Sequence, residues 1–132
     1  MFMNMKKLGL ACLGVFVFVF AFDFIVHGNM LKGLYEATAS AWRPMDEHDM
    51  RFMMASQLLF AVFLTYFFVK LGKTGMSDGI MYGLAIGTVL GAVQLGTYCY
   101  LPIPLSLTLA WVAAAVVKSV GCGAIAAKIY KA

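Results

Sequence analysis

The sequence predicts an all-α membrane protein: a single domain in which four spanning helices form a bundle. Three observations predict this class. Apolar residues make up 63% of the chain and charged residues only 12%, whereas a soluble domain carries about 25% charged residues. The apolar residues gather in four runs, each close to the roughly 20 residues that a spanning helix requires. Four glycines recur at every fourth position of the third run, a spacing typical of close helix packing in a bilayer.

The first span is expected at about 8–26. Its start, Met5-Lys6-Lys7 before an apolar run, also resembles a signal peptide. The run continues through 16–22 without a small-x-small cleavage site, so we expect a retained helix.

The stretch 27–51 is the longest that does not span. Its apolar and polar side chains fall on two different helical faces, which predicts a short amphipathic helix at the outer interface, between spans 1 and 2. Pro44 then fits the first position of the next helix, and Asp46 and Glu47 fit its first turn, where acids favour the helix dipole. The second helix is therefore expected to begin near Met45, one or two turns outside the membrane, and the second span is placed at about 45–70.

The third span, at 80–100, and the fourth, at 105–127, are joined by a short turn that contains Pro102 and Pro104. This turn predicts a tight antiparallel hairpin. Small residues form a column along each of the two helices, and we expect the columns to pack backbone against backbone. The predicted packing residues are Gly79, Gly83, Gly87 and Gly91 on one helix, and Ala115, Ser119, Gly123 and Ala127 on the other.

The basic residues predict the orientation. Six lysines flank the spans on one side: Lys6, Lys7, Lys70, Lys73, Lys128 and Lys131. By the positive-inside rule, both termini are expected to be cytoplasmic, most simply in a bacterial inner membrane. The net charge of +4 is thus a topology signal, and no nucleic-acid partner is expected.

Lys118 is the sharpest candidate for a functional site, because it lies near the middle of the fourth span. A lysine there costs about 3 kcal/mol on insertion scales, and such residues face a bundle interior, a cavity or a partner. It could attract an anion or take part in proton movement, or it could snorkel toward the cytoplasmic interface or pair inside the bundle.

Asp23, His27 and Gln94 complete the candidate intramembrane polar site. Asp23 is the natural counter-ion for Lys118. Counting residues puts Asp23 near the outer boundary and Lys118 roughly 20 Å down its helix, so a direct pair requires the first helix to extend outward, or water between the two groups. Asp23 and His27 share a helix face, where a carboxylate can orient an imidazole or relay protons, or where the two can simply end the helix. Gln94 suits either a hydrogen bond between helices or a polar path.

The segment 45–50 contains carboxylates, an imidazole and thioethers, so His48, Asp49 and Met50 are weak metal-ligand candidates. Neither HxxxH nor CxxC spacing is present, and no metal or other cofactor is expected. The sequence also lacks GxSxG, HExxH and a nucleotide-binding loop, so an enzyme is not expected.

The overall layout is similar to small four-helix bacterial membrane-protein families of unknown function. The features that carry the resemblance are the polar-aromatic stretch 34–44, the glycine column 79–91 and Gly121-Cys122-Gly123. The resemblance implies an architecture and no activity.

These features favour a non-enzymatic membrane component that works by helix–helix association, as a homo-oligomer or as an accessory subunit of a larger membrane complex. One hairpin needs the two small-residue columns only where they face each other. If the columns point in different directions, they exceed what the hairpin needs, which favours association with another chain. The alternative is a small transporter or channel whose polar path uses Lys118, Asp23, His27 and Gln94. An outer-facing metal or redox accessory protein is a third hypothesis. The surroundings of Lys118 discriminate between the association and transport hypotheses. Sealed packing around Lys118 favours association, and a hydrated cavity favours transport.

Overall fold

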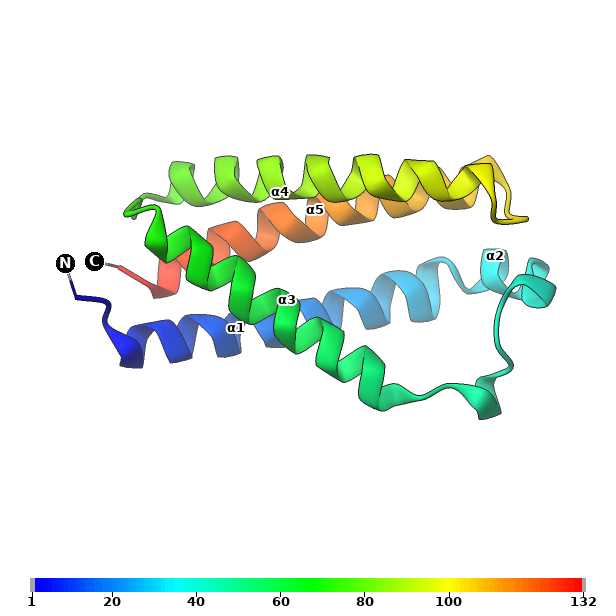
Figure 1. The fold of residues 1–132 in the computed structure, drawn as a ribbon, viewed down its shortest axis with the longest axis horizontal. Helices are drawn as coiled ribbons and strands as arrows, with labels where there is room; N and C mark the ends of the chain where they lie inside the picture. Colours follow the sequence, from blue (N-terminus) through cyan, green and yellow to red (C-terminus); the bar gives the residue numbers. More distant parts are fainter. Residues whose placement is uncertain (1, 132) are drawn as a thin grey trace.

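The structure, a computed structural model that describes residues 2–131, is a bundle of four long helices. Each is long and apolar enough to cross a membrane, which indicates an integral membrane protein. Neighbouring helices along the chain run in opposite directions, and both ends of the chain lie at the same end of the bundle (Figure 1). We call this the terminal end, and the opposite end the loop end. The long helices are α1 (Met5–Ile25), α3 (Met50–Lys70), α4 (Met76–Gly96) and α5 (Leu105–Ile129).

Short helical turns complete the chain at the loop end. A π-helical turn, η1 (Val26–Met30), continues α1 without a break. The short helix α2 (Lys32–Ala37) follows, at the place where the sequence predicts an amphipathic helix. Its position relative to a membrane, like the cytoplasmic placement of the termini, stays a prediction. The remaining turns are η2 (Ala39–Ala41), η3 (Met45–Glu47) and η4 (Thr97–Cys99).

The expected start of the second span near Met45 is wrong. Pro44 introduces only the single 3₁₀ turn η3, and His48 then returns to an extended backbone. Asp49 caps the long helix instead, because its carboxylate accepts a hydrogen bond from the backbone N–H of Arg51. A side-chain acceptor satisfies an unpaired N–H at the helix start, which proline cannot do. The span is therefore Met50–Lys70, and Asp46 and Glu47 lie outside it.

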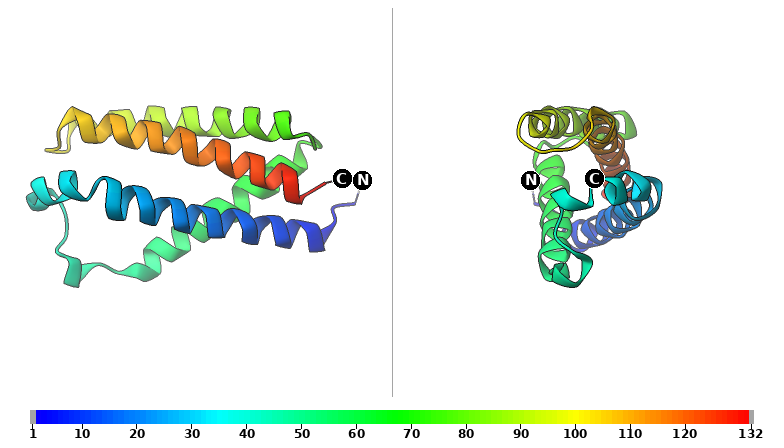
Figure 2. Two further views of the ribbon diagram at one scale, coloured as in Figure 1. Left: turned by 180° about the vertical axis from the view of Figure 1, so that it is seen from behind. Right: turned by 90° about the vertical axis from the view of Figure 1, so that its right-hand side faces the viewer.

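Helices α4 and α5 form the closest pair in the bundle (Figure 2). A Cβ added to Gly79 would collide with the carbonyl oxygen of Gly123, and one added to Gly83 with that of Ser119. At Gly87 an added Cβ would lie 2.6 Å from Cα of Val116. The two backbones therefore touch along the glycine column. The columns face each other within one hairpin, so neither remains as a free surface, and this reason for expecting an oligomer is lost.

Helix α3 crosses the bundle and is not parallel to its neighbours (Figure 1). Near Lys70 it lies beside the start of α4, where the hydroxyl of Tyr82 donates a hydrogen bond of 2.8 Å to the carbonyl of Leu64. Toward Met50 it moves away from α4 and α5. The terminal half of the bundle is closed by a packed apolar core, whose buried members are Val15, Val19, Ala61, Leu64, Phe68, Cys122, Ala126 and Ala127. We call this cluster the terminal core.

Candidate functional site

The site begins with Lys118, which lies midway along α5 and points into the bundle. Its ammonium lies 3.0 Å from Oδ1 of Asp23 on α1. The two side chains are only 21% and 17% exposed, so the ion pair is largely withdrawn from the surface. An unpaired charge at this depth would be costly, and pairing is what makes it tolerable. The direct pair considered from the sequence is thus present.

Two features remove the difference in depth that residue counting suggests. The π turn η1 carries the first helix to Met30, so Asp23 lies seven residues before its end instead of at the boundary. Long side chains on a helix also point toward its N-terminus. For Lys118 this direction is toward the loop end, where Asp23 lies. The helix extension required for a direct pair is therefore present.

Gln57 holds the second oxygen of the carboxylate. Its Nε2 donates a hydrogen bond of 3.0 Å to Oδ2 of Asp23, so both oxygens of Asp23 have a partner. Gln57 is buried, and its own Oε1 has no partner among the described residues. Gln57 is not among the site residues predicted from the sequence. An amide inside the apolar run 52–69 was a signal of the same kind as Gln94, and it could have been weighed in the same way.

The ring of Phe60 completes the surroundings of the ammonium. Nζ of Lys118 lies 5.4 Å from the centre of this ring, within the roughly 6 Å at which an aromatic face attracts a cation. Phe60 lies one helical turn from Gln57 on α3, so one face of α3 supplies both the amide that positions Asp23 and the ring beside Lys118.

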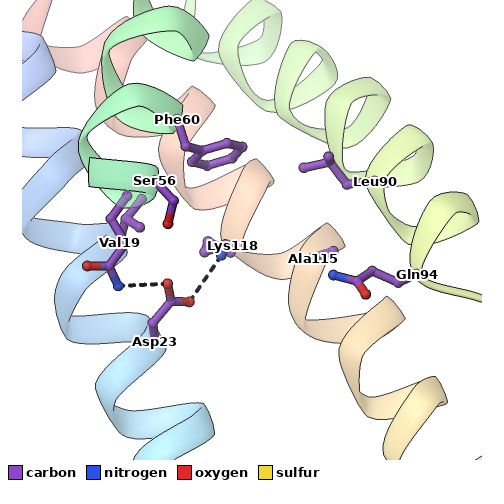
Figure 3. Close-up of a pocket in the computed structure, with 9 residues that line it drawn as sticks. Val19, Asp23, Ser56, Phe60, Leu90, Gln94, Ala115 and Lys118 are labelled. Atoms are coloured by element: carbon purple, nitrogen blue, oxygen red, sulfur yellow. Dashed lines mark hydrogen bonds and ion pairs between the residues drawn. The ribbon is translucent and has the colours of Figure 1, made fainter. Parts of the chain in front are cut away.

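The ion pair borders a cavity of about 280 Å³. The cavity lies in the loop half of the bundle, where α3 diverges from α4, and Figure 3 shows Leu90 and Gln94 on the opposite side of it from Asp23. The terminal core separates it from the other end of the bundle. Its lining residues are Val19, Asp23, Ser56, Gln57, Phe60, Leu90, Gln94, Ala115 and Lys118. The lining therefore carries one positive and one negative charge.

His27 does not join this cluster. Its Nδ1 lies 2.7 Å from the hydroxyl of Tyr35, and no hydrogen bond between Asp23 and His27 is found in residues 2–131. The same hydroxyl accepts a hydrogen bond of 2.7 Å from Nε1 of Trp111. The Tyr35 hydroxyl thus accepts from Trp111, and it donates to His27 when Nδ1 is the unprotonated ring nitrogen. These hydrogen bonds link α2 to η1 and α5, and the Trp42 ring packs against both Tyr35 and Trp111.

Tyr35 lies outside the predicted spans, and burial raises the pKa of its phenol. The hydrogen bond from Trp111 opposes this rise, while the negative charge of Asp23 adds to it. The neutral phenol, which can donate to His27, is therefore the form that the fold favours.

The weak metal-ligand candidates do not converge. The carboxylate of Asp49 is held by the Arg51 guanidinium at 2.8 Å, and these hydrogen bonds hold the pKa of Asp49 below its ordinary value. Nε2 of His48 lies 3.0 Å from the carbonyl oxygen of Arg43. Within the described chain, no three His, Cys, Asp or Glu residues come together as a metal site would require.

Comparisons with known proteins add no relative: no family model, no curated protein and no solved structure matches the chain. The resemblance to four-helix membrane families therefore stays one of architecture.

Proposed function

We propose that the chain is a small membrane transport protein, a transporter or channel, whose polar path is centred on Lys118 and Asp23. One observation carries the proposal: the paired charges border a cavity instead of lying sealed between packed helices. Charged groups inside spans are rare and expensive, and they typically mark substrate or ion pathways.

The distribution of packing along the bundle supports the same proposal. The cavity occupies the loop half, and the terminal core fills the other half with fully buried side chains such as Phe68 and Ala126. Closure of a path toward one side of the bundle is a feature of one state in alternating access. The crossing helix α3 borders the cavity at Gln57 and the terminal core at Leu64, so its movement would change both.

Gln94 and the Lys118–Asp23 pair belong to the proposed path, and His27 lies beyond it toward the loop end. His27 is tied to Tyr35 and so holds the short helix α2 near the mouth of the path. We propose for His27 a role in positioning α2.

Site-directed labelling tests this proposal. Single cysteines replace Gln94 or Ser56 at the cavity in a background without Cys12, Cys99 and Cys122. Matched controls are Val89→Cys on the exposed face of α4 and Ala126→Cys in the terminal core. Each variant in sealed, oriented vesicles is treated with a small charged thiol reagent added to one side at a time.

We expect the cavity cysteines to react from the loop side only. The Val89→Cys control should stay unlabelled until detergent is added, and the buried Ala126→Cys control should stay unlabelled in detergent as well. Cavity cysteines that stay unlabelled from both sides, yet react in detergent, would contradict a hydrated path. If Val89→Cys is labelled to the same extent, the reagent reacts with any exposed cysteine in the spans. Labelling of the cavity cysteines would then no longer support a hydrated path.

Helix–helix association is the second proposed function, as a homo-oligomer or as an accessory subunit of another membrane protein. The divergence of α3 from α4 favours it, because a helix of another chain could fill the space beside the ion pair (Figure 1). A native mass above that of one 14.4 kDa chain, together with protection of the Gln94→Cys thiol in membranes, would favour this function over transport.

A further inference from the structure

The Lys118 ammonium lies between two groups that attract cations. A carboxylate oxygen lies 3.0 Å from Nζ, and an aromatic face lies 5.4 Å from it. A carboxylate and an aromatic ring together are the groups by which proteins bind organic ammonium ions, since the ring attracts the cation without demanding a hydrogen bond.

This cation site is built independently of Lys118. Asp23 comes from α1, and Gln57 on α3 holds its second oxygen at 3.0 Å. Phe60 lies on the same helix as Gln57. Removing the lysine side chain would therefore leave the carboxylate, the amide that orients it and the ring on helices other than α5.

Lys118 reaches this site on a flexible chain of four methylene groups, and the cavity lies directly beside it. The walls contributed by Val19, Leu90 and Ala115 are apolar and suit the hydrocarbon part of a small amine. The lysine ammonium can leave Oδ1 without any backbone movement, since its side chain has several rotatable bonds.

We propose that the cavity binds a small organic ammonium ion at Asp23 and Phe60, and that Lys118 occupies the cation position in the free protein. A substrate amine would displace the lysine ammonium, and its hydrocarbon part would fill the cavity. An anion is disfavoured, because Asp23 already neutralises Lys118 and no other basic side chain lines the cavity. This inference names the substrate class of the proposed transport path and rests on that proposal.

Chemical rescue tests the assignment. The variant Lys118→Ala removes the tethered ammonium and leaves Asp23, Gln57 and Phe60 in place. The full-length variant, purified in detergent micelles at mildly alkaline pH, is heated with increasing n-butylammonium chloride. Sodium chloride at equal ionic strength and sodium butyrate serve as probe controls. Lys128→Ala, an exposed lysine on the same helix, is the matched variant.

We expect butylammonium to raise the unfolding midpoint of Lys118→Ala by several degrees in a saturable manner, because a ligand that binds the folded state stabilises it. The wild type and Lys128→Ala should respond much less. The double variant Asp23→Asn/Lys118→Ala should lose the response.

Three outcomes would overturn the assignment: no saturable shift in Lys118→Ala, an equal shift in the double variant, or stabilisation by butyrate in place of butylammonium. If Lys118→Ala does not fold, Lys118→Gln takes its place, since glutamine fills part of the space and carries no charge. Cavity cysteines that react with the thiol reagent while butylammonium has no effect would refute the ammonium site and leave the transport proposal standing. Unreactive cavity cysteines would refute the transport proposal itself.

Discussion

The side-chain amide of Gln57 donates a hydrogen bond to Oδ2 of Asp23, while the ammonium of Lys118 binds Oδ1 of the same carboxylate. Three helices thus meet at one carboxyl group. Asp23 is the centre of the site, and Lys118 and Gln57 are its two partners.

Gln57→Glu tests the role of the amide. The substitution keeps the shape and replaces the N–H donor with a second carboxylate beside Asp23, so we expect a loss of about 2 kcal/mol in unfolding free energy near neutral pH. The loss should shrink as the pH falls, because a protonated carboxyl can donate the hydrogen bond that the amide donated. Reversible unfolding in mixed detergent micelles measures both effects. Gln94→Glu, which places the same change across the cavity, should cost less; equal costs would show that the contact with Asp23 is not what matters.

A double-mutant cycle tests the ion pair. Asp23→Asn leaves a buried ammonium without its counter-ion, and Lys118→Met leaves a buried carboxylate with only Gln57. We expect each single change to cost about 2 kcal/mol, and the double variant to cost less than the two together by about 1–2 kcal/mol. The same unfolding measurement gives all four corners of the cycle. Additive costs would mean that the two groups do not interact energetically, despite their 3.0 Å separation.

Gly83→Ala tests the contact between α4 and α5. An added Cβ would collide with the Ser119 carbonyl oxygen and lie 2.7 Å from Cα of Val120, both of which are backbone atoms that cannot turn away. Overpacking of this kind costs about 1–3 kcal/mol. The matched control is Gly9→Ala in α1, where an added Cβ meets nothing within 4 Å, and alanine should there gain up to about 1 kcal/mol in helix propensity. If Gly83→Ala leaves the free energy of unfolding unchanged, the two helices of the hairpin can separate at this position at no cost.

Tyr35→Phe tests the attachment of α2 and its dependence on pH. Burial raises the pKa of Tyr35 above its ordinary value. Above a pH of about 10 the unfolded chain therefore releases a proton that the folded chain retains, and stability falls as the pH rises. Tyr35→Phe should reduce this fall at high pH, and it should lower stability at neutral pH by about 1 kcal/mol through the lost hydrogen bonds. Thermal unfolding followed by tryptophan emission measures both effects, since Trp111 is a direct partner. Tyr100→Phe, at an exposed tyrosine, is the control, and an identical pH profile in the two variants would contradict the assignment.

Much of the fold could be predicted because its signals are local. The four apolar runs give the four spans, and the two prolines near residue 103 give the hairpin turn. The start of the second span was missed because two acceptable helix starts compete there: Pro44 satisfies a backbone preference, whereas Asp49 supplies a hydrogen bond to Arg51. Such a competition is decided by the geometry of the chain between them.

The candidate site could be predicted only in part. Lys118, Asp23 and Gln94 stand out because polar groups in apolar runs are expensive, and all three line the cavity. His27 stood out for the same reason, yet it binds Tyr35, because the π turn and α2 bring that phenol close to it. Gln57 carries a signal of the same kind, a single amide in an apolar run.

By itself, the sequence determined that four apolar helices form, because the formation of each helix depends only on the length and polarity of its own apolar run. It also determined which charged groups need a partner, since their cost inside a membrane depends on local surroundings. Only the tertiary structure decided which partners they found. The crossing of α3 brings Gln57 and Phe60 to Asp23 and Lys118 and opens the cavity beside them, and that crossing depends on contacts between residues far apart in the chain. The two small-residue columns likewise face each other because of how α4 and α5 turn about their axes, which no spacing within either helix specifies.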